Sequence, residues 1–212
     1  MSERINKLFR QKPSGILSVF FTAGFPALGD TITIAKELER AGADMIEIGI
    51  PFSDPVADGP VIQASSKTAL DNGMNLSLLI AQLREIRQSV SIPVILMGYI
   101  NPVMQYGFER FCRDASAAGA DGLILPDLPL DVFESKFRKH TDAAGLCNVF
   151  LISPTTSEER IRRIDACSSG FIYAVSSSST TGARTGFSDE QVAYFERLQN
   201  MNLSNPLDRK ST

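Results

Sequence analysis

The stretch 43-ADMIEIGIPFSDPVADGPVIQ-63 decides the fold, because an apolar run with one carboxylate ends in a loop that holds two aspartates. Alternation along a strand puts Glu47 on the face opposite to Ile46, Ile48 and Ile50. A buried, ionised carboxylate is costly unless it is paired or its pKa changes. Glu47 is therefore a candidate functional residue. The alternative is a structural carboxylate that neighbouring hydroxyls satisfy.

Short apolar runs alternate with amphipathic helical patterns along the whole chain. Six runs predict strands, because each is short, rich in branched or aromatic residues and bounded by Gly or Pro. They cover residues 16–21, 44–50, 93–98, 122–125, 148–152 and 170–175. The alternation predicts a single α/β domain over residues 1–212, with a parallel sheet that is either open and doubly wound or closed as a barrel. The inward position of Glu47, opposite three isoleucines that would pack on helices, favours a TIM (β/α)8-type barrel with about six βα units present.

Local signals predict where several helices begin and end. Gly42, Gly119 and Gly145 each follow a helical pattern and precede a strand, where a left-handed residue ends the helix. After the second strand, Pro60 suits the start of an extra helix and 72-NG-73 its end.

Two expectations concern later helices. We expect capping boxes at Thr156 with Glu159 and at Ser188 with Gln191. A stripe of Val192, Phe195 and Leu198 predicts the buried face of the sixth helix.

The end of the sequence breaks the pattern. Residues 201–207, MNLSNPL, are typical of the approach to a seventh strand, but the polar sequence DRKST follows at 208–212. We expect no strand there. The first and sixth predicted strands should then have unpaired edges.

Composition excludes several classes of function. The net charge of −3, without a basic face, argues against a nucleic-acid partner. Cys112, Cys147 and Cys167 fall in apolar patterns, which predicts buried thiols rather than disulfides or a zinc site. His140 is expected to be a partly exposed structural residue. With no apolar signal segment or membrane span, we expect a cytoplasmic protein.

The candidate catalytic residues lie at the end of the second predicted strand. Sites in parallel α/β proteins form at the carboxyl ends of strands, so Glu47 can meet Asp54 and Asp58 of the following loop. Two carboxylates in different environments can divide acid and base roles. Asp58 is alternatively a turn residue, and Asp54 a brace of the loop.

Two other loops follow predicted strands. Residues 176–186, SSSSTTGARTG, offer hydroxyls, glycine N–H groups and Arg184 for an anion, and the same composition is usual for a mobile surface loop. A lid over an active site would satisfy both interpretations. Asp127, between prolines at 126–130, belongs to a rigid loop or a partner contact.

The sequence 47-EIGIPFSDPVADGPVIQ-63 closely resembles the signature of the tryptophan synthase alpha chain family. Four further segments are similar, in family order: FFTAGFP (20–26), MGYINPVMQYG (97–107), PDLP (126–129) and YAVSSSSTTGARTG (173–186). The resemblance covers about residues 1–205. It implies a TIM barrel that cleaves indole-3-glycerol phosphate to indole and glyceraldehyde 3-phosphate in tryptophan biosynthesis, without a metal or organic cofactor.

The resemblance also implies roles for individual residues. Glu47 matches the family's proton-shuttling glutamate, and Asp58 matches the aspartate that interacts with the indole N–H. The residues that match substrate-binding positions are Phe20, Tyr173, Thr181 and Gly182. Asp54 and Pro55, with Asp127 and Pro129, match the face toward the beta chain. That partner carries pyridoxal phosphate in an alpha2beta2 heterotetramer.

One departure from the family is specific. The family continues with a Gly-rich loop after strand seven and a Gly-Ser helix start after strand eight, which supply most of the phosphate site. This sequence contains neither, so we expect severely reduced activity for the 212-residue polypeptide. The alternatives are a noncatalytic partner that docks on and activates the beta chain, and a truncated product that does not fold stably.

Overall fold

The computed structural model describes residues 2–175 and 188–210. The chain forms two compact units, Met1–Cys147 and Asn148–Thr212. The division falls inside strand β5. The expected single domain over residues 1–212 stays a prediction.

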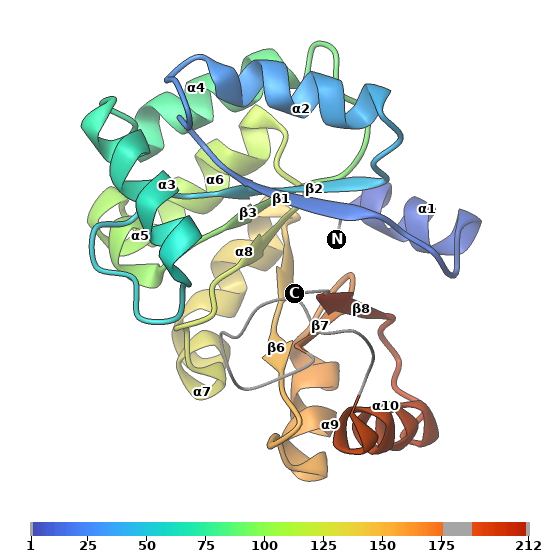
Figure 1. Ribbon diagram of the computed structural model, residues 1–212. Helices are drawn as coiled ribbons and strands as arrows, with labels where there is room; N and C mark the ends of the chain where they lie inside the picture. Colours follow the sequence, from blue (N-terminus) through green and yellow to red (C-terminus); the bar gives the residue numbers. More distant parts are fainter. Residues whose placement is uncertain (1, 176–187, 211–212) are drawn as a thin grey trace. The chain divides into compact units, whose positions relative to one another are not determined.

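The first unit alternates strands and helices in the predicted order (Figure 1). Its strands are β1 (Ser18–Thr22), β2 (Met45–Gly49), β3 (Val94–Met97) and β4 (Gly122–Ile124), and β5 (Cys147–Val149) begins at its last residue. Its helices are α1 (Glu3–Gln11), α2 (Asp30–Arg40), α3 (Pro60–Asp71), α4 (Leu76–Ile86), α5 (Ile100–Tyr106), α6 (Phe108–Ala118), α7 (Leu130–Val132), a π-helical segment (Phe133–Phe137) and α8 (Arg138–Ala144).

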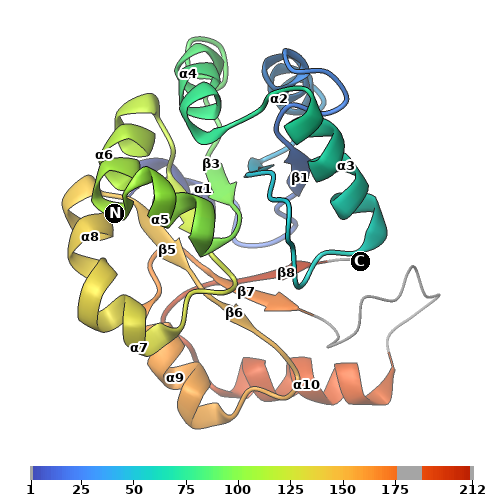
Figure 2. The ribbon, with the colours of Figure 1, turned by 90° about the vertical axis from the view of Figure 1, so that its left-hand side faces the viewer.

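Strands β1 to β5 follow one another in a single sheet, and β1–β2, β2–β3 and β3–β4 are parallel. Helices α2, α4, α6 and α8 pack against one another in that order (Figure 2). Every residue of β2 is buried, as are Leu79 and Leu83 of α4 and Phe111 of α6. The predicted alternation of buried strands and covering helices is therefore confirmed in this unit.

The predicted helix ends are also confirmed. Gly119 and Gly145 end α6 and α8 in the left-handed region, and Gly42 has a φ of +97° just after α2. The extra helix α3 begins at Pro60, and Gly73 follows its end with a φ of +92°. Local backbone chemistry, and not packing alone, therefore sets these boundaries.

A buried aspartate fixes the beginning of α1. The Asp121 side chain, 1% exposed, accepts hydrogen bonds from Ser2 Oγ at 2.6 Å and Arg4 Nη1 at 3.0 Å. It also accepts from Val94 N at 2.8 Å and from the Arg87 guanidinium. Because buried charges must be paired, Asp121 ties α1, α4 and β3 to one point.

A second aspartate holds the end of the same segment. Asp44 Oδ2 accepts hydrogen bonds from Lys12 Nζ at 2.5 Å and from Leu17 N at 2.7 Å. Asp44 and Asp121 are the last residues of the two AGAD sequences at 41–44 and 118–121. The repeated junction thus provides two anchors for the segment around α1.

The second unit contains β6 (Leu151–Ile152), α9 (Glu158–Cys167), β7 (Ile172–Val175), α10 (Asp189–Asn200) and β8 (Leu207–Lys210). Its sheet has the order β6-β7-β8, and both pairs are parallel. Helices α9 and α10 lie beside each other next to this sheet (Figures 1 and 2).

The expectation that no strand follows residue 207 is wrong, because β8 pairs with β7 from Leu207 to Lys210. The sixth predicted strand therefore has a neighbour on each side. Asp165 explains the approach to β8: it accepts hydrogen bonds from Ser204 N at 2.8 Å and Asn205 N at 2.9 Å. A parallel ladder uses backbone groups, so polar side chains do not prevent it.

Three further expectations differ from the structure. The predicted strand 148–152 is interrupted at Phe150 and gives β5 and β6, which belong to different sheets. Helix α9 is capped by Ser157 and not Thr156, whose hydroxyl instead accepts from Ser153 N at 2.9 Å. Val192 is 44% exposed, whereas Tyr194 and Leu198 are buried on α10.

The capping box of α10 is confirmed. Gln191 N donates to Ser188 Oγ at 3.3 Å, and Ser188 N donates to Gln191 Oε1 at 2.9 Å. The backbone N–H groups of Ser188 and Gln191, which have no partner within the helix, are therefore both hydrogen-bonded.

Candidate active site

Glu47 is the buried acid at the centre of the candidate site. The residue is 2% exposed on β2, and Ser18 Oγ of β1 donates a hydrogen bond to its Oε1 at 2.6 Å. Phe20 and Ile95 are its register partners on β1 and β3. The predicted burial of the carboxylate and a neighbouring hydroxyl are therefore both present, so geometry alone fits the structural and the functional interpretation.

Phe20 lies across the end of the same strand. A Cβ atom added at Gly49 would meet Phe20 Cζ at 2.6 Å, so the ring packs directly on the backbone of β2. Only a glycine permits this approach. Phe20 is half-buried, and its ring therefore offers an apolar surface two residues along the strand from Glu47.

Asp58 is brought close to an aromatic residue that follows β3. The side chain of Tyr99 is almost fully buried, and its Oη accepts a hydrogen bond from Ala57 N at 3.1 Å. Burial raises the pKa of Tyr99; the Ala57 hydrogen bond lowers it, while the charge and hydrogen bonding of Asp58 raise it further. Asp58 itself is half-buried in the loop before α3.

The expected partner-facing residues lie on two loops. Asp54 is exposed and accepts a hydrogen bond from Ser53 Oγ, and Pro55 is half-buried. Asp127 accepts from Ile100 N at 2.9 and 3.2 Å, so it also holds the first turn of α5. Pro129 is exposed. Asp127 thus has a structural task whether or not a partner binds.

The remaining predicted site residues lie in or after the second unit's sheet. Tyr173 is 4% exposed on β7, and its N–H donates to Phe150 O at 2.9 Å. Thr181, Gly182 and Arg184 lie outside the described residues.

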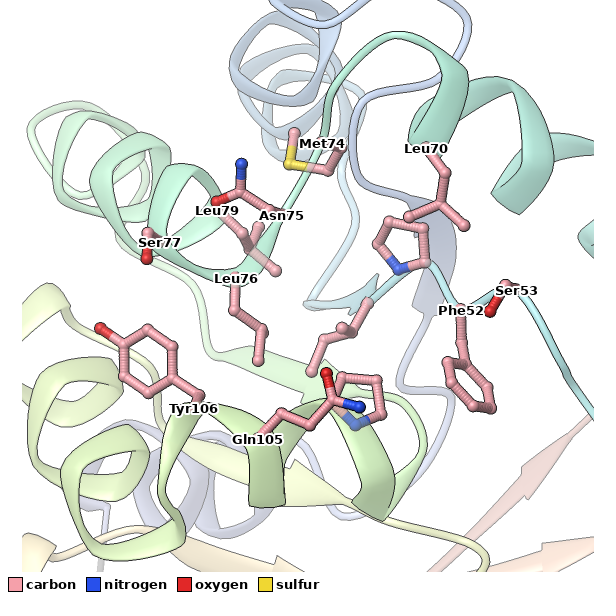
Figure 3. Close-up of a pocket in the computed structure, with 13 residues that line it drawn as sticks. Phe52, Ser53, Leu70, Met74, Asn75, Leu76, Ser77, Leu79, Gln105 and Tyr106 are labelled. Atoms are coloured by element: carbon pink, nitrogen blue, oxygen red, sulfur yellow. The ribbon is translucent and has the colours of Figure 1, made fainter.

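Two hollows flank the loop after β2. One, of about 500 Å³, lies between this loop, α4 and α5, where Phe52, Leu76 and Tyr106 face it (Figure 3). The other, of about 650 Å³, includes Phe52, Pro55 and residues of α3. Neither hollow is lined by Glu47 or Asp58, so both border the loop without forming the proposed reaction site.

Other reactive side chains have ordinary surroundings. Cys112, Cys147 and Cys167 are buried, as predicted, and burial raises the pKa of Cys112 to about 12. His140 lies on α8, where its Nδ1 is 3.8 Å from Glu109 Oε2. Within the described ranges 2–175 and 188–210, no cluster of three metal-binding side chains occurs, and no helix is long and apolar enough to cross a membrane.

Ser18 and Tyr99 were not identified from the sequence. Ser18 precedes Phe20 by two residues, so alternation could have placed its hydroxyl on the Glu47 face. Tyr99 comes just after β3, where parallel α/β proteins place functional residues. Its contact with the Ala57 backbone has no sequence signal.

Parallel βα units define an α/β protein of the barrel type, in which the buried acid of β2 and the aspartate of the following loop are candidate site residues. The sequence profile of the family "Tryptophan synthase alpha chain" matches residues 7–208. The chain belongs to the tryptophan synthase alpha chain family, whose members are lyases of tryptophan biosynthesis, and the expected TIM-barrel-type fold is confirmed.

Individual relatives agree with this assignment. The alpha chain of Parabacteroides distasonis is 57% identical over 96% of this chain and 79% of its own length. That of Flavobacterium psychrophilum is 55% identical over 96% and 80%. A crystal structure of the alpha subunit from Legionella pneumophila has a TM-score of 0.88 at 35% identity, covering 100% of this chain and 79% of that one.

One similar solved structure is a complex. The tryptophan synthase a2b2 complex from Pyrococcus furiosus matches with a TM-score of 0.84 at 36% identity, over 92% of this chain and 77% of that one.

Proposed function

We propose that this protein cleaves indole-3-glycerol phosphate to indole and glyceraldehyde 3-phosphate. The observation that carries the proposal is the buried side chain of Glu47, which accepts a hydrogen bond from the Ser18 hydroxyl and lies on the strand against which the Phe20 ring packs. Family membership supplies the reaction class. The chemistry is a retro-aldol cleavage that needs neither a metal nor an organic cofactor.

The reaction requires two proton movements and one stabilised charge. The bond between indole C3 and the first glycerol carbon breaks; C3 gains a proton, and the hydroxyl on that carbon loses one as the aldehyde forms. Glu47 serves as the proton shuttle: its carboxyl group gives a proton to C3 as a general acid, and the resulting carboxylate takes the proton that the hydroxyl loses as a general base. Positive character that develops at the indole nitrogen is stabilised by the carboxylate of Asp58, which accepts from the N–H.

The other predicted residues complete this proposal. Phe20 and Tyr173 contribute apolar surface for the indole ring, while Thr181 and Gly182 contribute to the loop around the phosphate. The hydrophobic contacts orient the ring, and the phosphate contacts supply binding energy that holds the reacting centre in place.

The test uses the purified 212-residue polypeptide mixed with a tryptophan synthase beta chain, and measures indole and aldehyde release. Glu47→Gln and Asp58→Asn should each lower kcat by about 100-fold or more, because a general acid–base group contributes about 10²–10⁴-fold and a group that stabilises developing charge about 10²–10³-fold. Glu37→Gln and Asp71→Asn remove exposed carboxylates as matched controls and should keep the rate of the unchanged protein. Undiminished rates in both site variants would remove the mechanism.

We infer that the loops of Asp54 and Asp127 face a beta chain, as in an alpha2beta2 heterotetramer, with pyridoxal phosphate held by the partner. The exposure of Asp54 and Pro129 supports an accessible surface. Asp54→Asn should weaken binding to a beta chain in calorimetric titration, while Asp71→Asn should not. Beta-chain stimulation without substrate cleavage would favour the second candidate function, a noncatalytic docking partner.

A further inference from the structure

Tyr99 lies between two loops that the proposed function uses for different purposes. Its hydroxyl oxygen accepts a hydrogen bond from the N–H of Ala57, which lies in the loop that carries Asp58. Its backbone precedes Ile100, whose N–H donates to both carboxylate oxygens of Asp127. We propose that Tyr99 is a positioning residue that fixes Asp58 for the reaction, and this inference rests on the proposed function.

The hydroxyl of Tyr99 can accept one hydrogen bond and donate another. A tyrosine hydroxyl has one proton to donate and lone pairs that accept. Because the Ala57 N–H donates to the oxygen at 3.1 Å, the proton of Tyr99 remains available for the neighbouring carboxylate of Asp58. The same oxygen thus holds the backbone of the residue before Asp58.

The ring of Tyr99 is itself held in place. It lies against Phe52 with the ring centroids 5.3 Å apart, and the residue is only 6% exposed. Asp127 fixes the turn from which the ring projects. A rigid, buried phenol can therefore restrain Asp58 in a loop that is otherwise bordered by two hollows.

The test compares Tyr99→Phe with Tyr106→Phe. Both changes delete one hydroxyl, and the Tyr106 hydroxyl also bonds a carboxylate, Asp114 Oδ2 at 2.9 Å, outside the proposed site. Tyr99→Phe keeps the ring packing and should lower kcat about 10-fold with little change in KM, because small displacements of a catalytic group cost rate. Tyr106→Phe should leave both constants unchanged.

A double variant separates positioning from general damage. In an Asp58→Asn background, Tyr99→Phe should cause no further loss of kcat, because the group that it positions is already disabled. An equal 10-fold loss in both backgrounds, or no loss in either, would overturn the inference.

Amide hydrogen exchange gives a readout that does not depend on catalysis. Tyr99→Phe should raise the exchange rate of the Ala57 amide, whereas Tyr106→Phe should not. If the unchanged protein cleaves no indole-3-glycerol phosphate, the proposed function fails, and this measurement still decides whether Tyr99 holds the Asp58 segment. An unchanged Ala57 exchange rate would overturn the positioning role.

Discussion

Ser18 is the residue whose hydroxyl meets the buried acid, and its removal measures what that contact contributes. Ser18→Ala deletes the donor to Glu47 Oε1, so the free energy of unfolding should fall by about 1–3 kcal/mol. Urea unfolding of both proteins checks this. Ser89→Ala, which removes only a long 3.4 Å bond to a backbone carbonyl, is the control and should cost much less.

A double-mutant cycle tests whether the contribution of Ser18 to stability depends on Glu47. In a Glu47→Gln background, Ser18→Ala should cost less than it does alone, because the carboxyl group that accepts the Ser18 hydrogen bond has been removed. Equal costs in both backgrounds would show that the Ser18 hydroxyl does not stabilise the carboxylate.

Single residues differ in how far the sequence predicts them. The burial of Glu47 follows from its apolar neighbours and from strand alternation, both of which are local. The contact between Tyr99 and the Ala57 amide joins residues 42 positions apart. Such a contact depends on how two loops fold over neighbouring strands, so spacing along the chain does not predict it.

At the scale of elements, the two AGAD junctions differ in what their glycines contact. Gly42 and Gly119 have nearly equal φ angles of +97° and +100°. A Cβ atom at Gly42 would meet nothing within 4 Å, whereas one at Gly119 would lie 2.4 Å from Arg87 Cγ. Arg87 donates to Gly119 O, Ile92 O and Asp121 from that position.

Alanine at the two positions should therefore have different costs. Gly42→Ala should lower the free energy of unfolding by about 1–2 kcal/mol, the usual cost of a left-handed residue with a side chain. Gly119→Ala should cost a further 1–3 kcal/mol or so, because the Arg87 side chain must move. Urea unfolding measures both, and equal losses would contradict the role of Arg87.

Elements were predicted well where their signals were local. The buried β2 strand, the Pro60 start of α3 and the capping box at Ser188 follow from alternation and cap chemistry. Strand β8 was missed because its side chains are polar, while its pairing depends on the distant Asp165 and on the backbone of β7. The break at Phe150 likewise reflects a change of sheet and not a local signal.

For the whole molecule, Asp44 in the first unit and Asp165 in the second link stability to pH. Burial raises the pKa of Asp44, but hydrogen bonds from Lys12 and Leu17 and the Lys12 charge outweigh it, so the pKa is lowered. Burial also opposes a lowered pKa at Asp165, where the hydrogen bonds of Ser204 and Asn205 prevail. Each stabilises the protein above the ordinary aspartate pKa of about 3.9.

That contribution should be lost as pH falls through the lowered pKa values of the folded state. Asp44→Asn and Asp165→Asn should each be less stable than the unchanged protein at pH 7, with the difference shrinking as pH falls below about 4. Thermal unfolding across pH checks this, with the exposed Asp71→Asn as control. A difference that is constant with pH would contradict the role of the charges.

The tie between α1 and Asp121 has a consequence for the time course of synthesis. Ser2 and Asp121 are 119 positions apart. At a translation rate of about 5–20 residues per second, roughly 6–24 s pass between the two. Ile5 of α1 is fully buried in the finished fold. During that interval Asp121 has not been made, so it cannot yet hold α1 in the position that buries Ile5. The nascent α1 is therefore available to a ribosome-associated chaperone until its anchor emerges.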